Sequence, residues 1–195
     1  MELPCVPALP LSTPRLVLRA FTPDDADELL VFHGNPESVR YVPYPARDRD
    51  AVVQVLERKV NSTALRADGD LLELAAELAT DGSVIGDLLV VVQSVEHGTV
   101  EIGYIFSPAH AGVGYATEAV RALVDLAVDL LGARRVVARV DVRNVQSRAL
   151  LSRLGFRQEA LLVENEVFKG ELTSEADYAV LDREWRALRS APSTT

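Results

Sequence analysis

The opening residues alternate in character and then change period. Residues 15–20 (RLVLRA) alternate polar and apolar side chains, which is the period of a half-buried strand. Thr22 then precedes Pro23 and a run of acids, which combines a helix-capping side chain, proline at the first helical position and negative charge at the positive end of the helix dipole. We therefore expect a strand and then a helix to about His33, and we interpret the acids as dipole partners, so that no metal is assigned to them.

A turn signal indicates that residues 71–93 form a β-hairpin and not a helix. Residues 71–79 have the propensity of a helix, but Asp81 and Gly82 form a turn before the β-rich run 83–93, so a hairpin is expected there. Prolines and helical spacing of apolar residues predict the segments on either side. These are a loop over 35–47, a helix over 48–65 and a further strand over 99–106.

The strongest helical pattern begins at Ala116 and ends at Gly132. Its apolar face and its polar face are cleanly separated, as an amphipathic helix requires. The apolar face consists of Ala119, Val120, Leu123, Leu126, Ala127 and Leu130. The remaining expected elements are a strand over 135–140, a short helix closed by Gly155, strands over 156–167 and 176–181 joined through Lys169 and Gly170, and a terminal helix over 182–189 that packs through Trp185.

Length and element order favour one α/β (α+β) domain. The chain has 195 residues and is 48% hydrophobic, which suits a single core at about 150 residues per domain. We expect a mixed, mostly antiparallel central sheet flanked by helices. Residues 1–13 are read as a loose lead-in, 14–189 as the domain and 190–195 as a frayed tail.

Charge and cysteine content narrow the class of protein. The chain has 20 Lys and Arg and 29 Asp and Glu, so its net charge is −9, which argues against a nucleic-acid binder. Cys5 is the single cysteine, so an internal disulfide is excluded and a reducing compartment is favoured. No basic region opens the chain and no apolar run approaches the roughly 20 residues of a membrane span, so the expected location is cytoplasmic, with no membrane partner.

A glycine-containing loop lies between a strand and the long helix. In residues 106–118 (FSPAHAGVGYATE), Gly112 and Gly114 precede the helix start, where backbone N–H groups are unpaired and carry partial positive charge. Neither the Walker A pattern nor the dinucleotide fingerprint fits, since Thr117 replaces the third glycine of the latter. On the glycines alone, a pyrophosphate-binding loop and a tight turn without a ligand are equally good readings.

Four segments in order resemble the GCN5-related N-acetyltransferases (GNAT), and within them the branch that acetylates ribosomal-protein N-termini. The segments are TPRLVLRAFTPDDADEL, VEIGYIFSP leading into GVGYATEAV, DVRNVQSRALLSRLGF, and a closing strand before DREW. The resemblance covers almost the whole chain. It implies a single-domain GNAT fold and an acetyl-CoA-dependent N-acetyltransferase without a metal.

The family signature is Gln or Arg, two residues, Gly, one residue, and Gly or Ala. Gly114 and Ala116 match its later positions, whereas Ala111 stands at the first position, which removes one side-chain donor to the pyrophosphate. The resemblance implies that coenzyme A is held by the backbone of the loop, by the strand before it and by the later Asn and Ser. The implied cofactor residues are Tyr104, Ile105, Phe106, Ser107, Gly112, Val113, Gly114, Tyr115, Ala116, Thr117, Asn144 and Ser147.

Direct transfer requires an amine without its proton, because an amine with a pKa near 10.4 is mostly ammonium at neutral pH. The resemblance implies that Glu101 takes this proton through water, and the alternative is an acid that faces solvent on the strand. Ser147 is the candidate acid for the thiolate that leaves, and its alternative, like that of Asn144, is helix capping. Many relatives use a tyrosine as the acid, but no Tyr occurs between Tyr115 and Tyr178.

The acceptor cannot be identified from these residues. The resemblance assigns the acceptor wall to residues 35–65 and 161–174, which carry no recognisable motif. The acceptor is a protein N-terminal amine or a small-molecule amine such as a polyamine, an aminoglycoside or an amino acid, and a non-catalytic CoA-binding sensor is the rival class. His33, His97 and His110 lack ligand spacing and are read as loop or surface residues. A monomer and a homodimer are both open.

Overall fold

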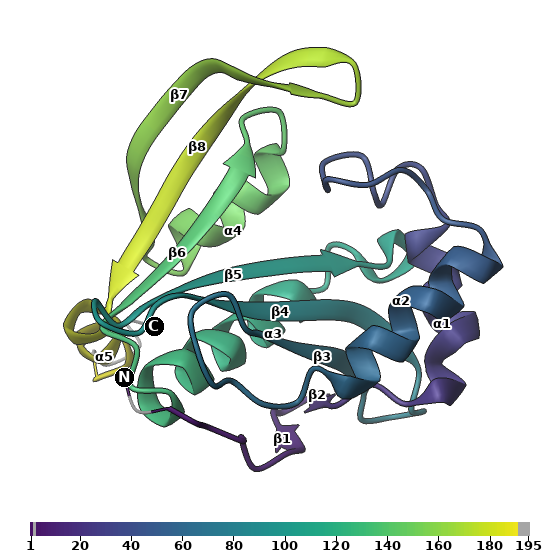
Figure 1. Ribbon diagram of the computed structural model, residues 1–195, viewed down its shortest axis with the longest axis horizontal. Coiled ribbons are helices and arrows are strands. Elements are labelled where there is room, and N and C mark those ends of the chain that lie inside the picture. Colours follow the sequence, from purple (N-terminus) through teal and green to yellow (C-terminus); the bar gives the residue numbers. More distant parts are fainter. Residues whose placement is uncertain (2, 191–195) are drawn as a thin grey trace.

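A computed structural model describes residues 1 and 3–190. The centre of the fold is an eight-stranded sheet with the order β1-β2-β3-β4-β5-β6-β8-β7 (Figure 1). Every neighbouring pair is antiparallel except β5 and β6, which run parallel. The strands are β1 (Leu11–Ser12), β2 (Leu16–Arg19), β3 (Leu71–Leu78), β4 (Val84–Ser94), β5 (Thr99–Phe106), β6 (Arg135–Asp141), β7 (Arg157–Phe168) and β8 (Glu171–Leu181).

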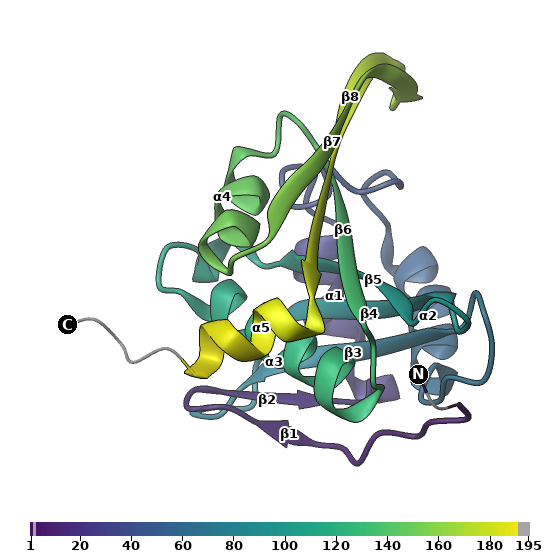
Figure 2. The same ribbon diagram turned by 90° about the vertical axis from the view of Figure 1, so that its left-hand side faces the viewer.

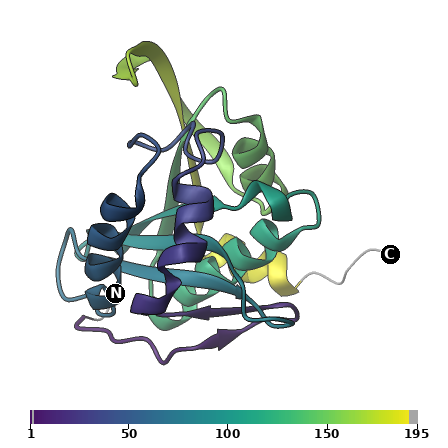
Figure 3. The same cartoon turned by 90° about the vertical axis from the view of Figure 1, so that its right-hand side faces the viewer.

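Helices cover both faces of the sheet. Helices α1 and α2 lie on one face (Figure 3), while α3 crosses the other (Figure 2). Their bounds are α1 (Ala26–His33), α2 (Arg49–Asn61), α3 (Tyr115–Asp125), α4 (Val145–Arg153) and α5 (Asp182–Ser190). Helix α3 continues as a π-helical turn, η3 (Leu126–Leu130), and short 3₁₀ turns η1 (Pro23–Asp25) and η2 (Pro108–His110) precede α1 and the glycine loop.

Strand alternation sorts the core into two clusters. On β3, Leu72 and Leu74 point toward α3, whereas Ala75 points toward α1 and α2. The larger cluster joins β2–β6 and β8 to α3, α4 and α5, and the smaller joins α1 and α2 to the opposite face. The smaller cluster contains only nine buried apolar residues, and buried charged groups fill the rest of that face.

The parallel strands β5 and β6 part soon after they meet. Their pairing runs from Thr99 with Arg135 to Glu101 with Val137 and ends there. Beyond Glu101, β5 stays paired with β4 while β6 diverges with β8 (Figure 1). Residues 102–106 therefore have no β6 partner in the described ladder, and their backbone groups on that edge are open to a ligand.

Most of the expected elements are confirmed. The hairpin over 71–93, the strand over 99–106, the long helix and the short helix closed by Gly155 all form, and Trp185 is fully buried. The last strand, β8, begins at Glu171, five residues before the expected start, because Lys169 and Gly170, both at positive φ, close the hairpin so tightly that pairing resumes at once. The fold class, α/β with a mixed sheet, is as expected.

The sequence predicts a loose lead-in and a frayed tail at the two ends of the chain. The lead-in is not loose: Cys5 pairs with Leu65 in both directions, and Leu11 extends the sheet beside Leu18, so these backbone groups are satisfied by the domain. The expected frayed tail lies outside the described residues except for Ser190, which ends α5. None of the described helices has the length and apolar character that a membrane span needs.

Candidate active site

The loop before α3 presents an array of free backbone amides. Gly112 and Gly114 have φ of +81° and +90°, a conformation that glycine adopts without strain. No described carbonyl or side chain accepts from the N–H groups of residues 112–117, and the first paired amide is that of Glu118, which donates to Gly114. A Cβ on Gly112 would contact nothing. Convergent, unpaired N–H groups at a helix start form a site for a phosphate anion.

The opening strand holds this loop in place. Arg15 donates from Nη1 to the carbonyl oxygen of Val113 at 2.9 Å and from Nε to Glu118 at 2.7 Å. The hydroxyl of Thr13 donates to the same carboxylate at 2.6 Å. These bonds, together with the charge of Arg15, hold the pKa of Glu118 below its usual value despite partial burial. The opening TPRL segment therefore shapes the loop, a role that the sequence did not predict.

Strand β5 presents its open edge next to the loop. Tyr104, Ile105 and Phe106 lie on that edge, and Ser107 follows them, with its N–H paired to Ile85 at 2.8 Å. Gly86 makes room for this edge, because a Cβ there would lie 2.4 Å from the ring of Phe106. The open edge of β5 thus leads through Ser107 and η2 into the glycine loop.

Ser147 reaches this surface from α4. Its hydroxyl lies 2.7 Å from the hydroxyl of Tyr104, so the two side chains link α4 to β5 beside the point where the strands diverge. Burial raises the pKa of Tyr104 to about 12, and the bond to Ser147 lowers it only in part. Asn144 accepts from the N–H of Ser147 at 3.0 Å and caps α4. The Asn144 side chain therefore caps α4, whereas the hydroxyl of Ser147 takes no part in the cap and is hydrogen-bonded to Tyr104.

Glu101 lies at the last paired position before β5 and β6 separate. Its side chain is 23% exposed, accepts from Gln93 at 2.9 Å, and lies 3.7 Å from the guanidinium of Arg139. Burial raises the pKa of Glu101, Arg139 opposes that rise, and the nearby Asp177 adds to it. The Glu101 side chain is therefore half-buried, and the carboxylate sits where its proton affinity is increased.

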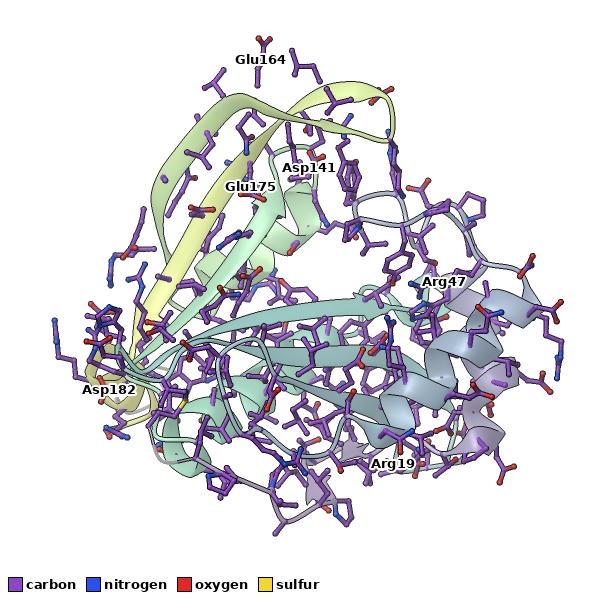
Figure 4. All side chains as sticks on the ribbon, in the orientation of Figure 1. Arg19, Arg47, Asp141, Glu164, Glu175 and Asp182 are labelled. Carbon is purple, nitrogen blue, oxygen red and sulfur yellow. The ribbon has the colours of Figure 1, made fainter. Side chains whose placement is uncertain are left out.

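Further acids surround Arg139 on β8 and β7. Asp177 and Glu175 project from β8 on the same face, and the pKa of Glu175 is raised by burial and by the charges of Asp177 and Glu166. Figure 4 shows Glu175 on this side of the molecule and Arg47 on the α1–α2 side opposite. The wall made by β6, β8 and β7 is therefore acidic next to Glu101.

The two segments expected to form the acceptor wall meet at one place. The tip of the β7–β8 hairpin extends toward the loop between α1 and α2 (Figure 1), and Lys169 donates to the carbonyl oxygen of Val39. A hollow of about 370 Å³ lies between them, lined in part by Arg40, Arg143 and Phe168. A larger hollow of about 600 Å³ lies between residues 8–14 and α3, and no predicted site residue lines it.

Beneath the α1–α2 loop lies a network of buried charges. Lys59 donates to Glu73 and, at 3.1 Å, to Asp87, which in turn contacts His33 Nε2 at 2.9 Å. His33 is 1% exposed, so its interpretation as a loop or surface residue is wrong. Its Nδ1 accepts from Arg47 at 2.8 Å, which ties the loop to the network. Sequence reasoning missed this network because its members come from four separate elements.

Comparison with known proteins identifies the family. Residues 15–157 match the model of the "Acetyltransferase (GNAT) domain", which covers well over half of the chain. The chain belongs to the GNAT acetyltransferase family. It is an enzyme, an acyl-CoA-dependent N-acetyltransferase.

Three relatives illustrate how far the GNAT likeness extends. The chain is 31% identical over 175 residues to the uncharacterized N-acetyltransferase p20 of Bacillus licheniformis, covering 90% of this chain and 97% of that one. It is 32% identical over 120 residues to the putative ribosomal N-acetyltransferase YdaF of Bacillus subtilis, or 62% and 66% of the two chains. The spermidine N-acetyltransferase of Vibrio cholerae in complex with CoA and spermine has a TM-score of 0.76 at 20% identity, covering 89% and 99%. That last likeness concerns the fold.

Proposed function

We propose that this GNAT enzyme transfers an acetyl group from acetyl-CoA directly to a primary amine, without an acyl-enzyme. The observation that carries the proposal is the open edge of β5 at residues 102–106, which leads straight into the free amides of residues 112–117. Amide-like pantetheine can pair with such an edge as an added strand, and a pyrophosphate fits the amides at the helix start. The single cysteine, which suits a reducing compartment, supports a cytoplasmic location for this reaction.

The polarity of the arrangement suits acetyl-CoA. The edge residues Tyr104 to Ser107 would bind the pantetheine arm, and an N–H there would support the oxyanion of the tetrahedral intermediate. The amides of Gly112 to Thr117 would bind the pyrophosphate, and the thioester would then lie near the divergence of β5 and β6. No metal enters the proposal. In residues 1 and 3–190, no three His, Cys, Asp or Glu side chains gather as a metal site would require.

Glu101 is the proposed general base. The ammonium acceptor must lose a proton before its nitrogen attacks the thioester carbon, and a carboxylate with a raised pKa holds that proton better than an ordinary one. Its side chain is half-buried at the end of the open edge, so one or two waters would connect it to the amine. The proton then leaves through the acidic wall toward solvent.

Ser147 is the proposed proton donor to the departing thiolate, with Tyr104 as its partner. As the carbon–sulfur bond breaks, the thiolate takes a proton or a hydrogen bond from the Ser147 hydroxyl. Ser147 regains that proton from Tyr104 or from water, since either hydroxyl can donate in their 2.7 Å contact. The pair would thereby do the work of the tyrosine acid that many relatives use.

Replacing Ser147 with alanine tests this assignment. We expect kcat to fall by about 10²-fold, the lower range for a lost general acid, while the KM for acetyl-CoA changes little. Tyr104→Phe should cause a smaller fall, because Ser147 keeps its hydroxyl and loses only its partner. Steady-state thiol release measures both. Equal kcat values for Ser147→Ala and the parent enzyme would remove Ser147 from the mechanism.

A protein N-terminal amine is the first acceptor that we propose. The opening and central motifs resemble the branch that acetylates ribosomal-protein N-termini, and the name of YdaF points the same way. The site is bordered by an exposed loop and an exposed hairpin that meet over it through Lys169 and Val39, and an extended peptide end could enter beside them.

A polyamine is the second candidate, and the acidic wall favours it. Glu101, Glu175 and Asp177 cluster around a single cation, Arg139, and a polycation would be attracted to that excess of negative charge. One assay separates the candidates: CoA thiol release with a peptide of neutral side chains and a free N-terminus, the same peptide with its N-terminus blocked, and spermidine. Turnover of the free peptide alone supports the first proposal, and turnover of spermidine alone supports the second.

A further inference from the structure

The glycine loop lacks the side-chain cation or amide that the family signature places at its first position. Ala111 is exposed, and its methyl group cannot donate a hydrogen bond. A pyrophosphate carries two negative charges, and backbone amides neutralise them only in part. A nearby cation from another element would replace what Ala111 cannot supply.

Arg153, the last residue of α4, reaches the start of the helix that follows the loop. Its Nη1 donates to the Thr117 hydroxyl at 3.2 Å, and Thr117 is the third residue of α3. The guanidinium therefore sits at the first turn of α3, beside the free amides. Among the described residues, this is the single hydrogen bond of the Arg153 side chain, which has no carboxylate partner.

This placement is electrostatically unusual. A helix N-terminus carries partial positive charge, so a guanidinium beside it is repelled unless an anion lies between them. Arg143 and Arg157 have carboxylate partners, whereas Arg153, like Arg58, has none among the described residues, and what distinguishes Arg153 is its position at the first turn of α3. Arg153 is favoured by the C-terminus of its own helix, but that dipole does not direct it to Thr117.

Arg15, the second arginine at the loop, already has partners within the protein. Arg15 forms its ion pair with Glu118 and binds the carbonyl oxygen of Val113, so its charge is largely neutralised within the protein. Of the two, Arg153 keeps its full charge for a ligand.

We propose that Arg153 binds the pyrophosphate of coenzyme A and replaces the donor missing at Ala111. The inference rests on the proposed function, because it requires acetyl-CoA at the glycine loop. The guanidinium and the amides of the loop would bind the phosphate oxygens from two sides, with Thr117 orienting the guanidinium.

Calorimetric titration of Arg153→Gln with acetyl-CoA tests this role. We expect the Kd to rise about tenfold at low salt, as for the loss of one charge-assisted hydrogen bond, and the difference to shrink in 1 M NaCl as charge is screened. Arg58→Gln is the matched control, since Arg58 is also an exposed arginine in the last turn of a helix, α2, and should leave the Kd unchanged. The Kd for acetyl-dephospho-CoA should rise by the same factor in Arg153→Gln, because this ligand keeps the pyrophosphate and lacks the 3′-phosphate.

The double variant Ala111→Arg/Arg153→Gln should recover most of the lost affinity, which a purely structural role for Arg153 would not allow. An unchanged Kd for Arg153→Gln would overturn the proposal, and so would a loss confined to acetyl-CoA with none for acetyl-dephospho-CoA. Failure of the parent protein itself to bind acetyl-CoA would instead contradict the proposed function, so the two failures are distinct.

Discussion

Lys59→Met is expected to lower the free energy of unfolding by about 3–5 kcal/mol, as for other buried ion pairs that lose one partner. Lys59 is 4% exposed and is the one cation that bonds both Glu73 and Asp87 in the buried network. Methionine fills the same space but leaves two buried carboxylates without it. One oxygen of Glu73, Oε2, has no hydrogen-bond partner even in the parent protein, so Lys59 is the one described partner of this carboxylate, whereas Asp87 keeps His33. Urea unfolding at neutral pH measures the change.

The neighbouring residue provides the control. Arg58→Met makes the same kind of change one position earlier in α2, at an exposed side chain, and should shift the free energy of unfolding by less than about 0.5 kcal/mol. Adding Glu73→Gln to Lys59→Met should restore part of the stability, because the carboxylate that has lost its partner is then removed. A midpoint for Lys59→Met within error of that for Arg58→Met would mean that the network does not stabilise the fold.

Lys59→Met should also change the pH at which the protein unfolds in acid. Asp87 is fully buried, yet Lys59 and His33 hold its pKa below the usual value. Its contribution to stability is therefore present above the unfolded pKa of about 3.9 and is lost as the pH falls through the lower folded pKa. Without Lys59 the pKa of Asp87 rises, so acid unfolding of Lys59→Met should begin at higher pH than that of the parent protein.

Glu101→Gln is expected to lower kcat by about 10²–10⁴-fold, the usual contribution of a general base. Glutamine keeps the shape of the side chain and can still bond Gln93, so folding and acetyl-CoA binding should be preserved. The parent enzyme should lose activity as the pH falls through the pKa of Glu101, which burial raises above 4.5. The residual activity of Glu101→Gln should not show this loss at low pH, because no carboxylate remains at position 101 to be protonated.

Glu175→Gln is the control that distinguishes a general base from an acid that only attracts a cationic acceptor. Glu175 lies on the same acidic face and also has a raised pKa, but it is on β8, away from the open edge. We expect it to raise the KM for a cationic acceptor with little change in kcat, the reverse of Glu101→Gln. If both variants lose kcat equally, or if Glu101→Gln keeps both its kcat and the loss of activity at low pH, Glu101 is not the base.

Local patterns predicted the elements and the loop, because each is encoded within a short stretch. Asp81 and Gly82 distinguished the hairpin from a helix, and the position of Gly112 and Gly114 between a strand and a helix indicated the anion-binding amides. The free edge of β5 could not be predicted this way. It depends on where β6 diverges after Glu101, which is a property of the assembled sheet.

Contacts between distant segments were the part that the sequence did not reveal. His33 bonds Asp87 across 54 positions, and nothing near either residue signals the other. Tyr104 was predicted to contribute its backbone, whereas its hydroxyl meets Ser147 across 43 positions. No tyrosine close to α4 in the sequence signals this contact, because Tyr104 lies on β5. Arg153 was missed for the same reason, since its partner Thr117 lies 36 positions away.

Amine-dependent release of the CoA thiol is the most direct test of the central claim, that this GNAT enzyme transfers acetyl from acetyl-CoA at the open edge of β5 to an amine. The parent protein should release thiol from acetyl-CoA only when a primary amine is present, with one acetylated amine formed per thiol. Thermal stabilisation by acetyl-CoA without thiol release for N-terminal peptides, polyamines, aminoglycosides or amino acids would contradict the claim and indicate a CoA-binding sensor.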